Sequence, residues 1–277
     1  MDTNQLTDFS RLCIHTITHK PWSLKETTDA FAREGVPGIT VWRDAVKDMT
    51  HEDAGKMIRD KGLDIVSYCR GGFFPGKTEA ERAAAIADNE KCIDEAAAIG
   101  APLIVLVVGA APGISLPEAR QQIADGIRAV LPRARDKGVK LAIEPLHPMY
   151  AAERSAVNSM KQANDMCEAI ADDHCGVAVD VYHLWWDDML KAEIERCAAL
   201  DKLFAFHICD WRSPTEDFLL DRGLMGEGVI NIREIRSWVE ATGYTGYNEV
   251  EIFSNRWWNE DQNKFLDQIK EAYLKHS

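Results

Sequence analysis

Short apolar runs alternate with longer segments of helical periodicity along the whole chain. The runs are apolar at consecutive positions, which is typical of parallel strands buried on both faces. We expect strands at Leu12–Ile17, Gly38–Trp42, Leu63–Cys69, Pro102–Val108, Val139–Glu144, Gly176–Asp180, Leu203–Cys209 and Tyr247–Ile252. We expect helices at Leu24–Glu34, His51–Lys61, Glu79–Ile99, Leu116–Lys137, Ser159–Ala171, Asp188–Ala198, Asn231–Thr242 and Trp258–Leu274. Regular strand–helix alternation predicts a parallel sheet.

Eight strand–helix units predict an α/β fold, the (β/α)8 TIM barrel, as a single domain spanning residues 1–277. An open doubly wound sheet is the alternative. Its dinucleotide-binding form carries Gly-x-Gly-x-x-Gly after the first strand, and that motif is absent here. The pattern therefore favours the barrel.

The composition narrows the class of protein. Seven scattered cysteines without a Cys-x-x-Cys pair indicate reduced thiols rather than a disulfide framework, and so a cytoplasmic protein. No apolar run approaches the roughly 20 residues of a membrane helix, so we expect no membrane partner. The net charge of −13 disfavours nucleic acid, whose binding leaves a basic footprint.

Four consecutive strands end in groups that bind metals. In such barrels the chemistry sits where strands end and the following loops begin. Three buried carboxylates would repel one another, and a divalent cation relieves that repulsion. A mixed oxygen and imidazole shell suits Mn²⁺, Mg²⁺, Co²⁺ or Zn²⁺. The predicted ligands are Glu144, Asp180, His207 and a glutamate of the last strand.

The last strand offers two glutamates, Glu249 and Glu251. Side chains alternate along a strand, so both point the same way. Glu251 lies closer to the end of the strand and hence to the site, whereas Glu249 lies deeper, as a support for the ligands or a core ion pair.

Five segments around the strand ends stand out, namely Ile143-Glu144-Pro145-Leu146, Asp180-Val181-Tyr182-His183, the His207 strand with Arg212 beyond it, Gly226-Glu227-Gly228-Val229-Ile230, and Gly246-Tyr247 leading to Glu251-Ile252-Phe253. Together they resemble the sugar phosphate isomerase/epimerase family of the xylose-isomerase-like barrels, which includes ketose 3-epimerases, hydroxypyruvate isomerase and inosose dehydratase. The resemblance implies one divalent metal, Mn²⁺ first, held by Glu144, Asp180, His207 and Glu251. It also implies that Glu144 and Glu251 are the catalytic proton-transfer pair.

The implied activity is a metal-dependent sugar isomerase or epimerase. It removes a proton beside the carbonyl of a ketose or keto-sugar through a metal-stabilised enediolate. A lyase or dehydratase acting on a keto-glycoside or inosose is the alternative, and a non-catalytic metal- or sugar-binding barrel is the second. The related endonuclease IV uses extra histidines on strands three and four, which this chain lacks, and this too argues against nucleic acid.

The substrate is expected to be a small sugar or keto-sugar. The resemblance implies that His183 and Arg212 contact its oxygens. Trp42 ends the second strand and Trp185 follows the sixth, so both could stack on a sugar ring, although aromatics also pack interfaces. His15 and His147 are further candidates, with a core histidine and a partner that orients the metal ligands as the respective alternatives. Trp257 and Trp258 could line the pocket or form an oligomer contact, and we expect a homodimer or homotetramer.

Overall fold

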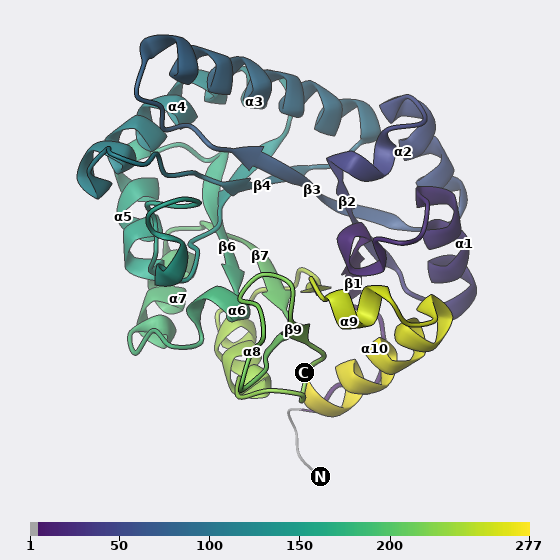
Figure 1. Ribbon diagram of the computed structural model, residues 1–277. Helices are drawn as coiled ribbons and strands as arrows, with labels where there is room; N and C mark the ends of the chain where they lie inside the picture. The colour runs from purple at the N-terminus through teal and green to yellow at the C-terminus, as the bar shows by residue number, and fades with distance from the viewer. Residues whose placement is uncertain (1–4) are drawn as a thin grey trace.

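Eight parallel strands close into a barrel (Figure 1). The computed structural model describes residues 5–277, so residues 1–4 of the expected domain lie outside the described residues. The strands are β1 (Leu12–His15), β2 (Gly38–Trp42), β3 (Asp64–Gly72), β4 (Leu103–Val107), β5 (Lys140–Ile143), β6 (Cys175–Asp180), β7 (Leu203–Ile208) and β10 (Asn248–Val250). Neighbouring strands follow chain order, and β10 pairs with both β7 and β1 to close the ring. The predicted TIM barrel is confirmed.

A helix follows each barrel strand and covers the outside of the ring (Figure 1). The helices are α1 (Leu24–Glu34), α2 (His51–Asp60), α3 (Glu79–Ile99), α4 (Leu116–Lys137), α5 (Met160–Ile170), α7 (Leu190–Ala199), α8 (Ile232–Ala241) and α10 (Gln262–His276). Local chemistry sets their ends. Ser23 and Glu26 form a capping box at the start of α1, and Gly100 ends α3 in the left-handed conformation. No helix in residues 5–277 is both long and apolar enough to cross a bilayer.

The structure contains short elements that the hydrophobic pattern did not predict. They are the 3₁₀ turns η1 (Thr16–His19), η2 (Arg43–Val46) and η3 (Pro148–Tyr150), the helices α6 (Val181–Leu184) and α9 (Asn255–Trp258), and the strands β8 (Asp210–Trp211) and β9 (Arg222–Gly223). Each lies in the connection that leaves the carboxyl end of a barrel strand, so the extra structure gathers at one rim. The last helix also begins later than predicted, at Gln262, because Asp261 caps it there.

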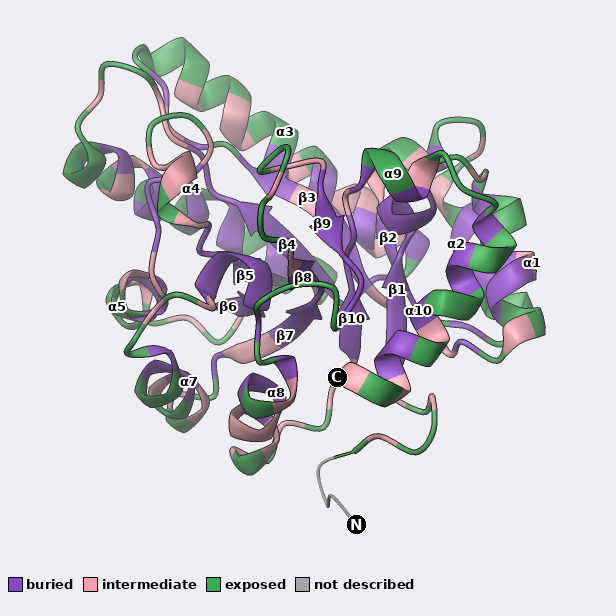
Figure 2. Ribbon diagram, turned by 60° about the horizontal axis from the view of Figure 1, so that its bottom comes forward, coloured by how far each residue is buried: buried purple, intermediate pink, exposed green. Residues whose placement is uncertain are grey.

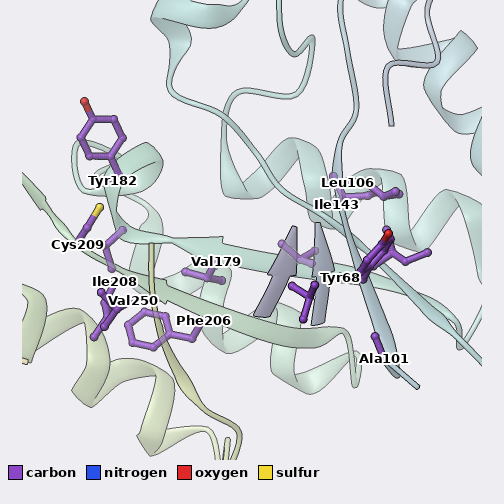
Figure 3. Close-up of a cluster of buried hydrophobic side chains, with 14 of the residues drawn as sticks. Tyr68, Ala101, Leu106, Ile143, Val179, Tyr182, Phe206, Ile208, Cys209 and Val250 are labelled. Carbon is purple, nitrogen blue, oxygen red and sulfur yellow. The ribbon is translucent and has the colours of Figure 1, made fainter. Parts of the chain in front are cut away.

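Apolar side chains pack on both faces of the barrel wall, and the strands are buried while the outer helix faces are exposed (Figure 2). The larger cluster lies between strands and helices and includes Ile143, Val179 and Phe206 (Figure 3). A smaller cluster forms on the other face of the same strands, which points into the barrel. Its members are Cys69, Leu103, Val105, Ala142, Ala178 and Ala205.

Candidate metal centre and active site

Strand alternation places the predicted ligands inside the barrel. A residue two positions beyond an inward-facing one also faces inward, because side chains alternate with a period of two. Three small inward-facing alanines are each followed in this way by a predicted ligand. The pairs are Ala142 and Glu144, Ala178 and Asp180, and Ala205 and His207.

The four predicted ligands meet at the carboxyl rim. One ligand atom from each of Glu144, Asp180, His207 and Glu251 lies within 4.8 Å of the others, and all four residues are buried. Glu144 Oε1 lies 3.1 Å from His207 Nδ1, yet both atoms lack a hydrogen-bond partner. Buried polar atoms in this state are costly unless a further group binds them. The donor set and its unpartnered atoms therefore fit a divalent cation.

Arg222 is the principal residue that the sequence did not reveal. Its Nη1 atom donates to Glu251 Oε2 at 2.7 Å and to Asp180 Oδ2 at 3.2 Å. The guanidinium is buried, with a side chain 3% exposed, and also lies over the ring of Tyr182. Arg222 thus neutralises part of the negative charge of two predicted ligands from the cavity side.

A second polar layer lies deeper in the barrel, around Glu249. Its Oε2 atom lies 3.2 Å from His15 Nε2 and 3.8 Å from His207 Nε2, and accepts hydrogen bonds from Thr40 and Ser67. His15 also approaches Glu251, with 3.1 Å between Nδ1 and Oε1. Glu249 is therefore a buried anion beneath the ligands, and Glu251 is the glutamate in the ligand group.

The carboxylates control the charge of the two histidines. Burial disfavours the imidazolium of His207, but the charge of Glu249 and the contact with Glu144 outweigh burial and raise its pKa to about 9. Burial opposes the charged form of His15 too, while Glu251 and Glu249 raise its pKa to about 9. Burial raises the pKa of Asp180 to about 7 against the opposing influence of Arg222. Without a metal, the surrounding carboxylates therefore favour the charged form of both histidines.

The loop that carries Arg222 is fastened to Asp210. This carboxylate accepts backbone hydrogen bonds from Trp211, Gly226, Gly228 and Ile230. Strand β9 pairs antiparallel with β8, which sets Trp211 opposite Arg222. At Gly228 a Cβ atom would lie 2.0 Å from the Trp211 carbonyl oxygen, so only glycine fits. These contacts turn the loop back over the barrel and direct Arg222 toward the ligands.

A cavity opens beside the ligand group, and four of the predicted site residues line it. These are Glu144, Glu251, His183 and Trp42. The unpredicted lining residues include Arg222, Phe253, Arg70, Tyr150 and Arg154. His183 accepts a hydrogen bond from the His147 backbone amide at Nδ1, and its Nε2 lies 3.2 Å from Arg222 Nη2. Burial, reinforced by Arg222, keeps the pKa of His183 well below its ordinary value, so its ring is neutral.

The other predicted contacts lie away from this lining. Arg212 forms an ion pair with Asp221, and its side chain is 28% exposed. His147 and Trp185 pack against Trp211, with ring centroids 5.0 Å and 5.6 Å away. His15 is fully buried beneath the ligands, where Trp42 Nε1 approaches its Nδ1 at 3.2 Å. The structure brings none of these four into the cavity lining.

Comparison with known proteins adds an independent line of observation. The family model described as xylose isomerase-like TIM barrel matches residues 28–272. An inosose isomerase of Halalkalibacterium halodurans is 26% identical over 216 residues, covering 75% of this chain and 73% of that protein. A crystal structure of a Sinorhizobium meliloti protein is 44% identical, with a TM-score of 0.93, over 97% of this chain and 99% of that one. The structure of the IolI protein with a bound zinc atom shares the fold, with a TM-score of 0.83 at 20% identity over 96% and 97% of the two chains.

Proposed function

We propose that this chain, a member of the xylose isomerase-like TIM barrel family, is a divalent-metal-dependent isomerase or epimerase of a ketose or keto-sugar. The observation that carries the proposal is the buried convergence of Glu144, Asp180, His207 and Glu251. The likeness to an inosose isomerase supports a sugar-type substrate. The zinc atom bound to the IolI protein, which has the same fold, supports a bound metal.

A bound divalent cation would supply Lewis-acid polarisation of the substrate carbonyl, which lowers the pKa of the neighbouring C–H bond. Glu144 and Glu251 follow β5 and β10, which are separated in the barrel by β6 and β7. They therefore face the cavity from different sides. We assign one to removal of the proton and the other to its return, since proton transfer by positioned side chains contributes roughly 10²–10⁴-fold to the rate.

The face and carbon that receive the proton decide the product. Return to the same carbon from the opposite face inverts that centre, and return to the adjacent carbon moves the carbonyl. We assign His183 and Arg222 to the substrate oxygens, because both line the cavity and are buried. Arg222 also holds Glu251 as an anion, since it outweighs the effect of burial and keeps the pKa of that carboxyl well below its usual range.

The cavity is too small for a sugar, so side chains must move when substrate enters. The cavity volume is about 30 Å³, far below the roughly 300–1,000 Å³ of a typical ligand pocket. Leu219 lines the cavity, and the neighbouring Phe218 carbonyl accepts hydrogen bonds from the Tyr150 and Tyr182 hydroxyls. We propose that these two bonds break to admit the sugar, because they tie the 215–220 segment to Tyr182 and to Tyr150, which lines the cavity.

The proposal is tested by proton exchange in D₂O. Wild type, Glu144→Gln and Glu251→Gln are saturated with Mg²⁺ and incubated with a panel of ketoses, 3-keto-glucosides and inososes, and metal content is measured in each. Wild type is expected to incorporate solvent deuterium into a substrate, and each variant to lose at least about 100-fold in rate. Glu153→Gln, an exposed change of the same kind, is the control and keeps the wild-type rate.

Wild-type exchange in either metal-loaded glutamine variant contradicts the assignment. Loss of water or release of an aglycone from the substrate identifies the lyase chemistry that shares the same first step. A cytoplasmic location and a dimeric or tetrameric assembly stay predictions of the sequence.

A further inference from the structure

Two arginines in the substrate cavity have no hydrogen-bonding or ionic partner among residues 5–277. Arg70 lies near the end of β3, and Arg154 follows η3 in the connection after β5. Among residues 5–277, every other arginine donates a hydrogen bond to a carboxylate or a carbonyl oxygen. These donors are Arg11, Arg33, Arg43, Arg59, Arg82, Arg120, Arg128, Arg133, Arg135, Arg196, Arg212, Arg222, Arg233, Arg236 and Arg256.

The neighbours of the two arginines are aromatic rings rather than acids. The Arg70 guanidinium lies 4.5 Å from the centre of the Phe73 ring, and that of Arg154 lies 5.6 Å from the Tyr150 ring. Both side chains are half-buried. In a chain with 45 acidic and 32 basic residues, carboxylates are in excess, so a shortage of acids cannot explain two unpaired arginines.

The two guanidinium groups are close enough to affect each other. Burial lowers the pKa of Arg70, and the positive charge of Arg154 lowers it further. The two cations therefore repel across the cavity, with no carboxylate within ion-pair distance of either in the described chain. Such an arrangement costs free energy, and an anion placed between the two groups would recover it.

The charge balance of the site leaves these two cations in excess. The ligand group contributes the carboxylates of Glu144, Asp180 and Glu251. A divalent cation and the buried Arg222 would together neutralise those three charges. Beneath them, the Glu249 carboxylate lies 3.2 Å from the His15 ring. Arg70 and Arg154 have no such counterpart.

We propose that the substrate is an anionic keto-sugar, whose carboxylate or phosphate group binds between Arg70 and Arg154 while its carbonyl end lies at the ligand group. This inference rests on the proposed function and names the substrate class of the same site. The guanidinium fork binds carboxylate and phosphate oxygens with two parallel hydrogen bonds, so both anions share the required chemistry. The two arginines line the same cavity as Glu144 and Glu251, so a single sugar can contact both the arginine pair and the ligand group.

The first test measures anion binding without activity. Inorganic phosphate and, separately, malonate are titrated by calorimetry into metal-free wild type, Arg70→Met, Arg154→Met and the double variant. Each single change is expected to raise the Kd about tenfold, and the double change about 100-fold. Arg128→Met removes an exposed arginine of α4 and is the matched control, with an unchanged Kd. An unchanged Kd in the double variant, or equal losses in the control, overturns the proposal.

The second test uses the metal-loaded protein and compares kcat/KM for a hexulose, its 6-phosphate and the corresponding hexuluronate. The proposal predicts preference for one of the two anions, and the preferred one identifies the group. That preference is expected to fall about tenfold in Arg154→Met and to stay in Arg128→Met. Arg154→Met alone suffices if the double variant does not fold.

The two proposals fail in different ways. If phosphate or malonate binding depends on the arginines but no sugar exchanges protons, the reaction is refuted and the anion site stands. If a neutral ketose is turned over best, and at the same rate in Arg154→Met, the anion site is refuted and the reaction stands.

Discussion

Replacement of Arg222 by methionine tests whether this arginine neutralises the ligand carboxylates in the metal-free protein. Methionine keeps the length of the side chain and removes its charge. Glu251 and Asp180 then lose the cation that contacts them at 2.7 Å and 3.2 Å. Breaking a buried ion pair from one side costs roughly 3–5 kcal/mol, because a charge stays buried without compensation.

The expected change in melting temperature follows from the size of the chain. At roughly 2.1 cal/mol/K per residue, unfolding of 277 residues carries an entropy of about 0.6 kcal/mol/K. A loss of 3–5 kcal/mol therefore lowers the Tm of the metal-free variant by about 5–9 °C. A bound cation compensates the charge of the same carboxylates. With saturating Mn²⁺ we therefore expect the Tm difference between wild type and variant to shrink to about 2–3 °C, which corresponds to the lost hydrogen bonds.

Differential scanning calorimetry with and without Mn²⁺ measures both deficits. Arg133→Met is the control, since Arg133 of α4 forms an exposed ion pair with Asp94. Its loss is expected to stay within about 1 kcal/mol and not to depend on the metal. A deficit in Arg222→Met that is equal with and without Mn²⁺ would refute the reasoning, because the metal and Arg222 would then not compensate the same charges.

Three further predictions follow from buried groups elsewhere in the structure. His207 has a raised pKa of about 9 and must be neutral to bind a metal, so metal binding below pH 9 releases a proton. The apparent metal affinity is therefore expected to rise about tenfold per pH unit from pH 7 to 9. A metal affinity that does not depend on pH in calorimetry would exclude His207 as a ligand. Asp210→Ala removes the acceptor of four backbone amides and is expected to lower the free energy of unfolding by about 3–5 kcal/mol. The backbone amides of residues 211–230 are also expected to exchange hydrogen faster. Unchanged protection of these amides would show that Asp210 does not hold the loop. All seven cysteines are buried and free, so a thiol reagent is expected to label none in the native protein and seven after denaturation, and rapid native labelling would contradict the packing.

The sequence was sufficient to predict the barrel and the ligand group because both depend on local patterns. Consecutive apolar positions indicate buried parallel strands, and a carboxylate or imidazole at the end of such a strand must lie at the rim. The alternation that separates Ala142 from Ile143 also directs Glu144 inward. These relations need only the chain order of the strands, which the barrel closes into a ring.

The choice between Arg212 and Arg222 could not be made in this way. Both arginines lie in one long connection, and the segment between them has no periodic pattern. The pairing of β8 with β9 and the hydrogen bonds to Asp210 decide which arginine faces the ligands, and both are tertiary contacts. The unpaired state of Arg70 and Arg154 is also invisible in the sequence, because it depends on which acids lie nearby in space.

The metal site itself is tested most directly by a crystal structure of the Mn²⁺-loaded protein, with anomalous scattering to locate the metal. The account predicts one ion per chain, bound by Glu144, Asp180, His207 and Glu251, with Arg222 beside it. An ion bound elsewhere would contradict the account. The account would also be contradicted if no ion were bound at saturating Mn²⁺ and Arg222 still joined Glu251 to Asp180.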